Sequence, residues 1–234
     1  SMVTVESPAG RSRRSVLAGL LAVPFAGLAN GCAPISRNDD ETPDARIALV
    51  YRGPAGCAGC SETLAERLSQ SPLGMDVAFI GPHEEFPLKS SALSGVALYA
   101  QPGGGDDIRA AAQSFPADFI RGVSDFVAAG GSYLGICMGA YLAGSEGFGF
   151  FSESVEGEVG VPDFPVIDST DDVVAVTWGD TMRWTYFQEG ARLPGDGAEA
   201  YAHYETGDLA AACYRFGDGS VGLIGPHPEA DATW

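Results

Sequence analysis

The sequence predicts an α/β domain built on a mostly parallel sheet that helices cover on both faces. Short apolar runs, each long enough for one buried strand, recur through the first half of the domain and alternate with helical patterns. Strands that are apolar on both faces are typical of parallel sheets buried between helices. After Phe150 the pattern changes to β-rich runs joined by tight turns, so we expect a partly antiparallel C-terminal half.

The first half contains four predicted strands and three predicted helices. The strands are the apolar runs 46–51, 75–81, 96–100 and 132–136. The first helix is expected to begin at Ser61, whose hydroxyl suits an N-cap, and it carries leucines at helical spacing. The second lies in the stretch 115–131 and ends at Gly130 and Gly131, which suit a C-cap. The third opens at Met138, shortly after the fourth strand.

The second half contains five predicted strands, separated by turn residues. They are the runs 173–179, 182–190, 198–205, 209–217 and 220–225. The aromatic residues of the first two runs are interpreted mainly as core, with pocket lining as the alternative. Cys213, in the fourth run, is expected to be a buried and unreactive thiol.

The composition is that of a globular and strongly acidic protein. The chain has 234 residues, enough for one large domain or two small ones, and 45% of them are hydrophobic. The formal net charge is −18 and the isoelectric point is about 4.3. Because binding to nucleic acid or to an anionic membrane surface needs lysine and arginine side chains, this charge argues against both as partners.

The first 32 residues are predicted to be a signal peptide. Basic residues, which include the pair Arg13 and Arg14, precede an apolar run from Val16 to Ala29 that is too short to span a bilayer. The arginine pair resembles a twin-arginine export signal, and the stretch before Cys32 resembles a lipobox, in which the cysteine is lipidated. An ordinary signal peptide with incidental arginine and cysteine residues is the alternative.

This prediction divides the chain into three parts. They are the signal peptide 1–32, an acidic flexible tether 33–45 and a folded domain 46–234. We expect export by the twin-arginine route to the cell envelope. The chain would contact the membrane only through the lipid on Cys32, because a multiply acylated cysteine is an effective anchor.

Cys137 is the first candidate for catalysis. It follows the predicted strand 132–136 and precedes a helix, within a Gly-x-Cys-x-Gly pattern formed with Gly135 and Gly139. This pattern is typical of a nucleophile elbow, in which the central residue is strained and side chains two positions away would clash. Taken alone, however, the pattern favours a structural cysteine buried in an apolar strand.

Two further motifs favour the catalytic interpretation. His227 and Glu229 follow the predicted strand 220–225, and a histidine can take a thiol proton while a carboxylate orients its ring. Pro102 and the three glycines after it follow the strand 96–100, where backbone N–H groups can face a developing oxyanion. A surface turn and an ordinary loop are the respective structural alternatives.

In this order, the three motifs resemble those of the class I glutamine amidotransferase-like superfamily. The stretches GGSYLGICMGAYLAG and YRFGDGSVGLIGPHPEAD are most similar to the branch named after the N-terminal domain of certain biotin–protein ligases. The resemblance extends from about Arg46 to Asp231 and implies a flavodoxin-like, doubly wound sheet. It also implies cysteine-dependent attack on an amide or a related acyl group.

The resemblance implies a role for each motif residue. Cys137 would be the nucleophile, His227 the general base and acid, and Glu229 its orienting partner. The oxyanion hole would consist of backbone N–H groups, those of Met138 and of Gly103 or Gly104. No synthetase or biotin-ligase catalytic domain is recognisable, so we expect a small-molecule or envelope amide substrate without identifying it. No cofactor is expected.

Cys57 and Cys60 form a Cys-x-x-Cys pair in the first strand-to-helix loop. Outside the cytoplasm such a pair suggests a disulfide or a thiol-redox motif, and metal binding is a third alternative. Because this loop opens onto the same sheet edge as Cys137, we expect one of the two cysteines to lie near it. His83 and His203 stand alone in the sequence, so no metal site is expected at either.

Other functions stay open on the sequence alone, and a cysteine protease or deglycase of the same superfamily is one of them. A non-catalytic envelope binding protein would keep the fold without turnover. A thiol-redox protein would use the pair Cys57 and Cys60 instead of Cys137. The presence of a cysteine, a histidine and a glutamate in the expected order favours an enzyme over both.

Overall fold

The computed structural model describes residues 46–231 and residue 234. The predicted signal peptide with Cys32 and the predicted tether lie outside the described residues. Most strands join one sheet: β1 (Arg46–Tyr51), β2 (Met75–Ile80), β3 (Val96–Gln101), β4 (Ser132–Ile136), β6 (Asp172–Trp178), β7 (Thr181–Phe187), β9 (Glu199–Tyr204), β10 (Leu209–Phe216) and β11 (Gly219–Ile224). The other two strands, β5 (Glu156–Gly157) and β8 (Ala191–Arg192), pair with each other.

The large sheet has nine strands in the order β2-β1-β3-β4-β11-β10-β9-β6-β7. Its first five strands are parallel to one another, in the order of a flavodoxin-like sheet. The inner strands are buried on both faces: in β1, Leu49 and Tyr51 join one core cluster while Ala48 and Val50 join the other. This double burial explains why a continuous apolar run marks a strand in this part of the sequence.

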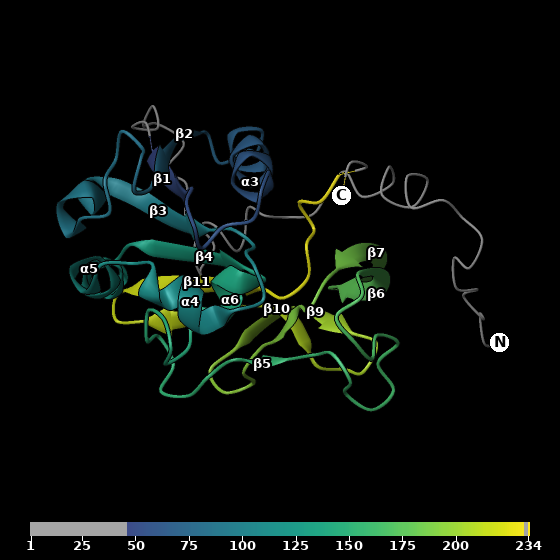
Figure 1. Cartoon of the computed structure of the whole chain (residues 1–234). Helices are drawn as coiled ribbons and strands as arrows, with labels where there is room; N and C mark the ends of the chain where they lie inside the picture. Colours follow the sequence, from purple (N-terminus) through teal and green to yellow (C-terminus); the bar gives the residue numbers. More distant parts are fainter. Residues whose placement is uncertain (1–45, 232–233) are drawn as a thin grey trace, which may run out of the picture.

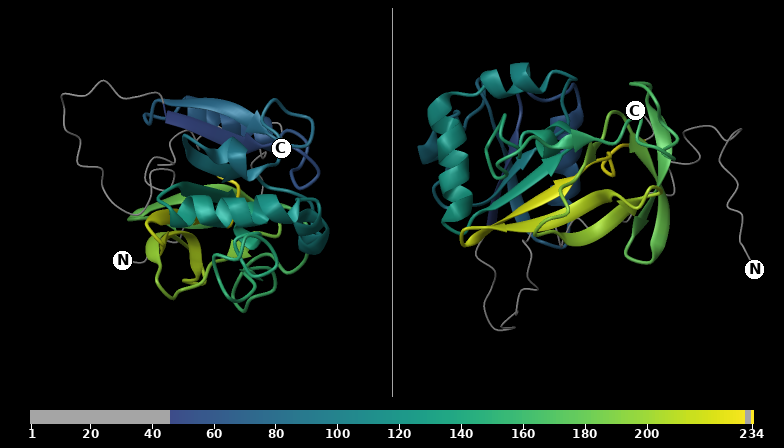
Figure 2. Two further views of the ribbon diagram at one scale, coloured as in Figure 1. Left: turned by 90° about the vertical axis from the view of Figure 1, so that its left-hand side faces the viewer. Right: turned by 90° about the horizontal axis from the view of Figure 1, so that it is seen from below.

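Helices cover both faces of the parallel part of the sheet (Figures 1 and 2). They are α3 (Cys60–Ser69), α4 (Ile108–Gln113), α5 (Ala117–Ala128), α6 (Met138–Tyr141) and the short 3-10 helix η1 (Ser90–Leu93). Leu64 and Leu68 of α3 join one core cluster, whereas Phe119 and Val123 of α5 join the other. No helix within the described ranges has both the length and the apolar character needed to cross a bilayer.

The antiparallel strands extend the parallel sheet at one end. β10 pairs with β11 and β9, β9 pairs with β6, and β6 pairs with β7. The hairpin of β6 and β7 lies at the opposite end of the molecule from α5 (Figure 1). The predicted fold class is confirmed, and the β-rich half is a continuation of the parallel sheet.

Two helices differ from the prediction. α3 begins at Cys60, and its N-cap is Gly59, with a left-handed φ of 82° that favours glycine. The predicted cap, Ser61, is wrong because its hydroxyl donates to the carbonyl of Tyr51 at 2.7 Å. α4 was not predicted, although Asp107 caps it by accepting a hydrogen bond from the N–H of Ala110 at 2.8 Å.

Candidate active site

Cys137 lies at the sharp turn between β4 and α6. Its backbone has φ of 48° and ψ of −104°, a conformation that is strained for a residue with a side chain. The turn is held because the N–H of Cys137 donates to the carbonyl of Ile224, in the neighbouring strand β11, at 2.9 Å. The thiol is free, and the residue is 8% exposed. A strained residue between a strand and a helix is the geometry of a nucleophile elbow.

Gly135 and Gly139 make this turn sterically possible. A Cβ atom on Gly135 would overlap the backbone of Gly139, and one on Gly139 would overlap the carbonyl oxygen of Gln101 at the end of β3. Neither glycine has a positive φ. Close approach of the backbone, rather than conformational freedom, is therefore the reason for glycine at both positions.

The chain after β11 brings His227 and Glu229 to the same edge of the sheet. Nδ1 of His227 lies 2.9 Å from a carboxylate oxygen of Glu229, and the two residues are 4% and 0% exposed. The backbone N–H of His227 donates to the carbonyl of Tyr186 at 2.8 Å, which ties it to the end of β7. The ring also interacts electrostatically with the side chain of Cys137, and both residues line the same cavity. The three side chains thus form one buried array.

The charges in this array determine the protonation of His227. Burial lowers the pKa of the ring, but the negative charges of Cys137 and Glu229 and the hydrogen bond to Glu229 outweigh burial and raise the pKa to about 10. At neutral pH the ring of His227 is therefore protonated, and it interacts with both the Cys137 sulfur and the Glu229 carboxylate. A proton held there is available to a leaving group.

The glycine loop after β3 packs against the array. A Cβ atom on Gly103 would lie 2.5 Å from the ring of His227, so the ring can pack there only against glycine. A Cβ atom on Gly104 would lie 2.8 Å from the side chain of Met138. Among the backbone hydrogen bonds that the described residues form outside helices and strands, none is donated by the N–H of Gly104 or the N–H of Met138. Both groups are available to an oxygen of a bound molecule.

A cavity of about 500 Å³ opens beside Cys137 and His227. Its lining includes residues that sequence reasoning singled out: Cys57, Gly104, Cys137, Met138 and His227. The lining also includes residues that it missed: Asp106, Tyr141, Ser169, Gln188, Glu189 and Trp234. Gly103 and Glu229 are not among the lining residues, but both contact the ring of His227, which is.

Gln188 and Glu189, which follow β7, form a wall of the cavity that contacts the elbow and the helix after it. The Cys137 sulfur lies 3.6 Å from the carbonyl oxygen of Gln188, and the hydroxyl of Tyr141 donates to the carbonyl of Glu189 at 2.7 Å. The only part of this contact that the sequence indicates is Tyr141, because it lies within the elbow stretch. The position of the wall itself depends on how the antiparallel strands fold back, which local patterns do not encode.

Cys57 and Cys60 form a disulfide, with Cα atoms 5.3 Å apart. Cys57 and Cys137 both line the cavity, and the sulfur of Cys60 lies near Gly103. Cys213 is fully buried in β10, as predicted.

Comparison with known proteins places this chain in a family. Residues 47–166, just over half of the chain, match the sequence family described as "Biotin-protein ligase, N terminal". The chain belongs to this family. The matched part of the family domain contains the glycine loop and the elbow but ends before His227 and Glu229. No curated protein gives a significant match to the chain.

Solved structures support a glutamine amidotransferase-like fold for the family domain. A glutamine amidotransferase matches with a TM-score of 0.53 and 17% identity, over 78% of this chain and 90% of that one. A protein from Thermoplasma acidophilum that is assigned as a GMP synthase subunit matches with a TM-score of 0.53 and 18% identity, over 81% and 87%. The GH42 β-galactosidase Gan42B from G. stearothermophilus has a TM-score of 0.47 and 14% identity, over 79% of this chain and only 28% of its own.

Proposed function

We propose that this protein is an amidotransferase-like cysteine hydrolase that cleaves an amide or a related acyl bond. The observation that carries the proposal is the buried array of Cys137, His227 and Glu229, with the thiol on a strained elbow at a cavity of about 500 Å³. The amidotransferase-like fold and the family fit a hydrolase or amidotransferase reaction. The substrate would be a small molecule or an amide of the cell envelope.

The mechanism follows from the positions of these groups. The Cys137 sulfur attacks the carbonyl carbon, and the N–H groups of Met138 and Gly104 receive the developing oxyanion. The tetrahedral intermediate collapses, the C–N bond breaks, and the amine leaves with the proton of His227. Water then attacks the thioester while His227 takes a proton from it, which releases the acid and restores the thiol. Glu229 is a positioning residue, because it holds the ring through Nδ1.

The pKa of His227 predicts the alkaline limit of activity. Amide cleavage needs the protonated ring, so kcat/KM should fall above about pH 10, where the ring loses its proton. The charge of Glu229 raises this pKa, and Glu229→Gln should therefore move the alkaline limb to lower pH. The measurement is a pH profile of hydrolysis of an active amide from a probe panel. Glu62→Gln, which changes an exposed carboxylate, is the matched control.

An alkaline limb near the ordinary histidine value of about pH 6.5 in the wild type would contradict this prediction. An unchanged limb in Glu229→Gln would contradict the contribution of Glu229.

We also propose that the protein is exported by the twin-arginine route and anchored at the cell envelope through lipid on Cys32, since the motifs of residues 1–32 support this location. Replacing Arg13 and Arg14 together by lysine should retain the precursor in the cytoplasm, and Cys32→Ala should release the exported protein from the membrane fraction. Cell fractionation with immunoblotting measures both, with Arg11→Lys as the control. Unchanged fractionation of both variants would reject the proposed location.

A further inference from the structure

The Cys57–Cys60 disulfide lies at the candidate active site without a role in the proposed mechanism. It closes the turn between β1 and α3, and Cys57 lines the same cavity as Cys137. The turn contacts the glycine loop directly, because the N–H of Cys57 donates to the carbonyl of Gly103 at 2.9 Å. A second contact supports the first: a Cβ atom on Gly104 would lie only 2.5 Å from the carbonyl oxygen of Ala55.

The hydrogen bond from Cys57 orients the N–H that would bind the oxyanion. The carbonyl of Gly103 and the N–H of Gly104 belong to one peptide unit, which is planar and trans, so the two groups point in opposite directions. A donor that holds the carbonyl therefore also fixes the direction of the N–H. The direction of an oxyanion donor matters because a misaligned donor stabilises the transition state much less.

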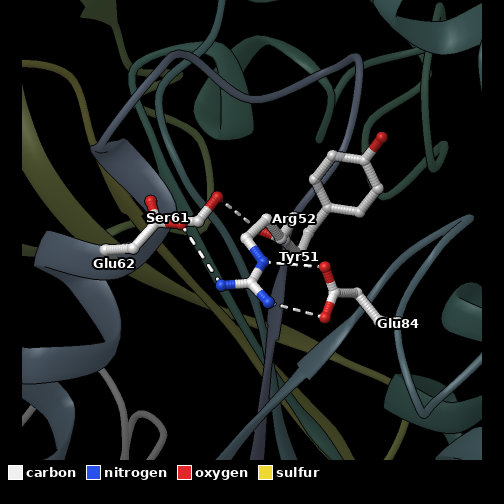
Figure 3. A network of polar contacts seen from close by, with 5 residues as sticks. All are labelled: Tyr51, Arg52, Ser61, Glu62 and Glu84. Atoms are coloured by element: carbon white, nitrogen blue, oxygen red, sulfur yellow. Dashed lines mark hydrogen bonds and ion pairs between the residues drawn. The ribbon is translucent and has the colours of Figure 1, made fainter.

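The base of the turn is held independently of the disulfide (Figure 3). Arg52 forms a two-pronged ion pair with Glu84, with both distances 2.7 Å, and a longer one of 3.3 Å with Glu62. The hydroxyl of Ser61 donates to the carbonyl of Tyr51 at 2.7 Å. Opening the disulfide would leave the tip of the turn, which carries Cys57, held by weaker contacts such as the hydrogen bond from the N–H of Cys60 to the carbonyl of Cys57 at 3.2 Å, while its base stays in place.

We propose that the Cys57–Cys60 disulfide is a positioning element of the oxyanion site, and that its reduction slows acyl transfer without unfolding the domain. The inference rests on the proposed function. In the reduction, a dithiol transfers two electrons and two protons: the bond between the two sulfurs breaks, both cysteines become thiols, and the dithiol becomes a disulfide. The Cys57 N–H then loses its fixed position on Gly103, and the N–H of Gly104 loses its fixed direction.

The experiment compares the wild type with the double variant Cys57→Ser and Cys60→Ser in two reactions of Cys137. Acylation by p-nitrophenyl acetate builds an oxyanion, whereas alkylation by iodoacetamide does not. Removal of one oxyanion donor costs about 100-fold to 1,000-fold in rate, so a loosened donor should slow acylation by about 10-fold to 100-fold. Alkylation should stay within about 2-fold. Equal acylation rates, or a parallel loss of both reactions, would overturn the proposal.

Hydrogen exchange gives a second readout that needs no turnover. In the double variant, exchange at the Cys57 amide and in the segment 101–108 should become faster, while the strands of the sheet keep their protection. Unchanged exchange in this segment would overturn the proposal. A wild-type protein that is not acylated would reject the proposed function, and faster exchange in the variant would still support the positioning of Gly104. Glu66→Gln, an exposed change on α3 whose carboxylate accepts a hydrogen bond from the side chain of Gln70, is the control.

Discussion

Replacement of Cys137 by alanine should abolish turnover, with a fall in kcat of about 10,000-fold or more. The variant keeps the elbow backbone but removes the sulfur that forms the acyl-enzyme bond. His227→Ala should cause a loss of similar size, because the ring supplies the proton for the leaving amine. The double variant should be little worse than either single variant, since the two groups act as one unit.

The measurement is steady-state hydrolysis of amide and thioester probes, together with the rate of Cys137 alkylation by iodoacetamide. Glu66→Gln, an exposed change on α3 outside the lining of the cavity, should retain wild-type kinetics. Turnover that survives in both single variants would remove the assignment of Cys137 and His227. A wild-type thiol that alkylates slowly at neutral pH, with no turnover of any probe, would instead favour a non-catalytic binding protein on this fold.

The replacement Gly139→Ala should damage stability and activity together. Its new Cβ atom would overlap the carbonyl oxygen of Gln101, and this contact joins the elbow to the strand that leads into the glycine loop. Inserting one carbon into a packed position typically costs about 1–3 kcal/mol. The elbow or β3 must shift to make room, and displacement of catalytic groups by about 1 Å can lower activity by about 100-fold.

Thermal unfolding and probe hydrolysis measure the two effects. Gly195→Ala is the matched control, because its new Cβ atom would enter open space and Gly195 does not have a positive φ. The control should change the free energy of unfolding by no more than about 0.5 kcal/mol. Wild-type stability and activity in Gly139→Ala would show that the close approach between the elbow and β3 is not needed.

The parallel part of the fold could be read from the sequence because its signals are local. Each buried strand is a short apolar run, and Gly135, Cys137 and Gly139 occur within five residues of one another. The position of Cys137 after a strand and before a helix follows from the same stretch. His227 and Glu229 lie far along the chain, but their place directly after the last strand indicates the same edge of a parallel sheet.

Other features could not be read because they depend on contacts between distant segments. Gln188 and Glu189 reach the cavity only because β6 and β7 fold back as a hairpin beyond β9. The predicted start of α3 was wrong because the hydroxyl of Ser61 can either cap a helix or bond to another segment. In the folded domain it donates to the carbonyl of Tyr51 in β1. A hydroxyl that bonds to a neighbouring strand is no longer available as a cap.

The fold class, the elbow and the residues of the Cys137 array are specified by local sequence patterns, because apolar periodicity and close glycine spacing are properties of short segments. How these segments work together is set by long-range packing. That packing places the ring of His227 over Gly103, closes the cavity with residues 188–189, and brings the disulfide of Cys57 to the carbonyl of Gly103. These relations depend on the order and register of strands that are distant in the chain, and no local pattern specifies them.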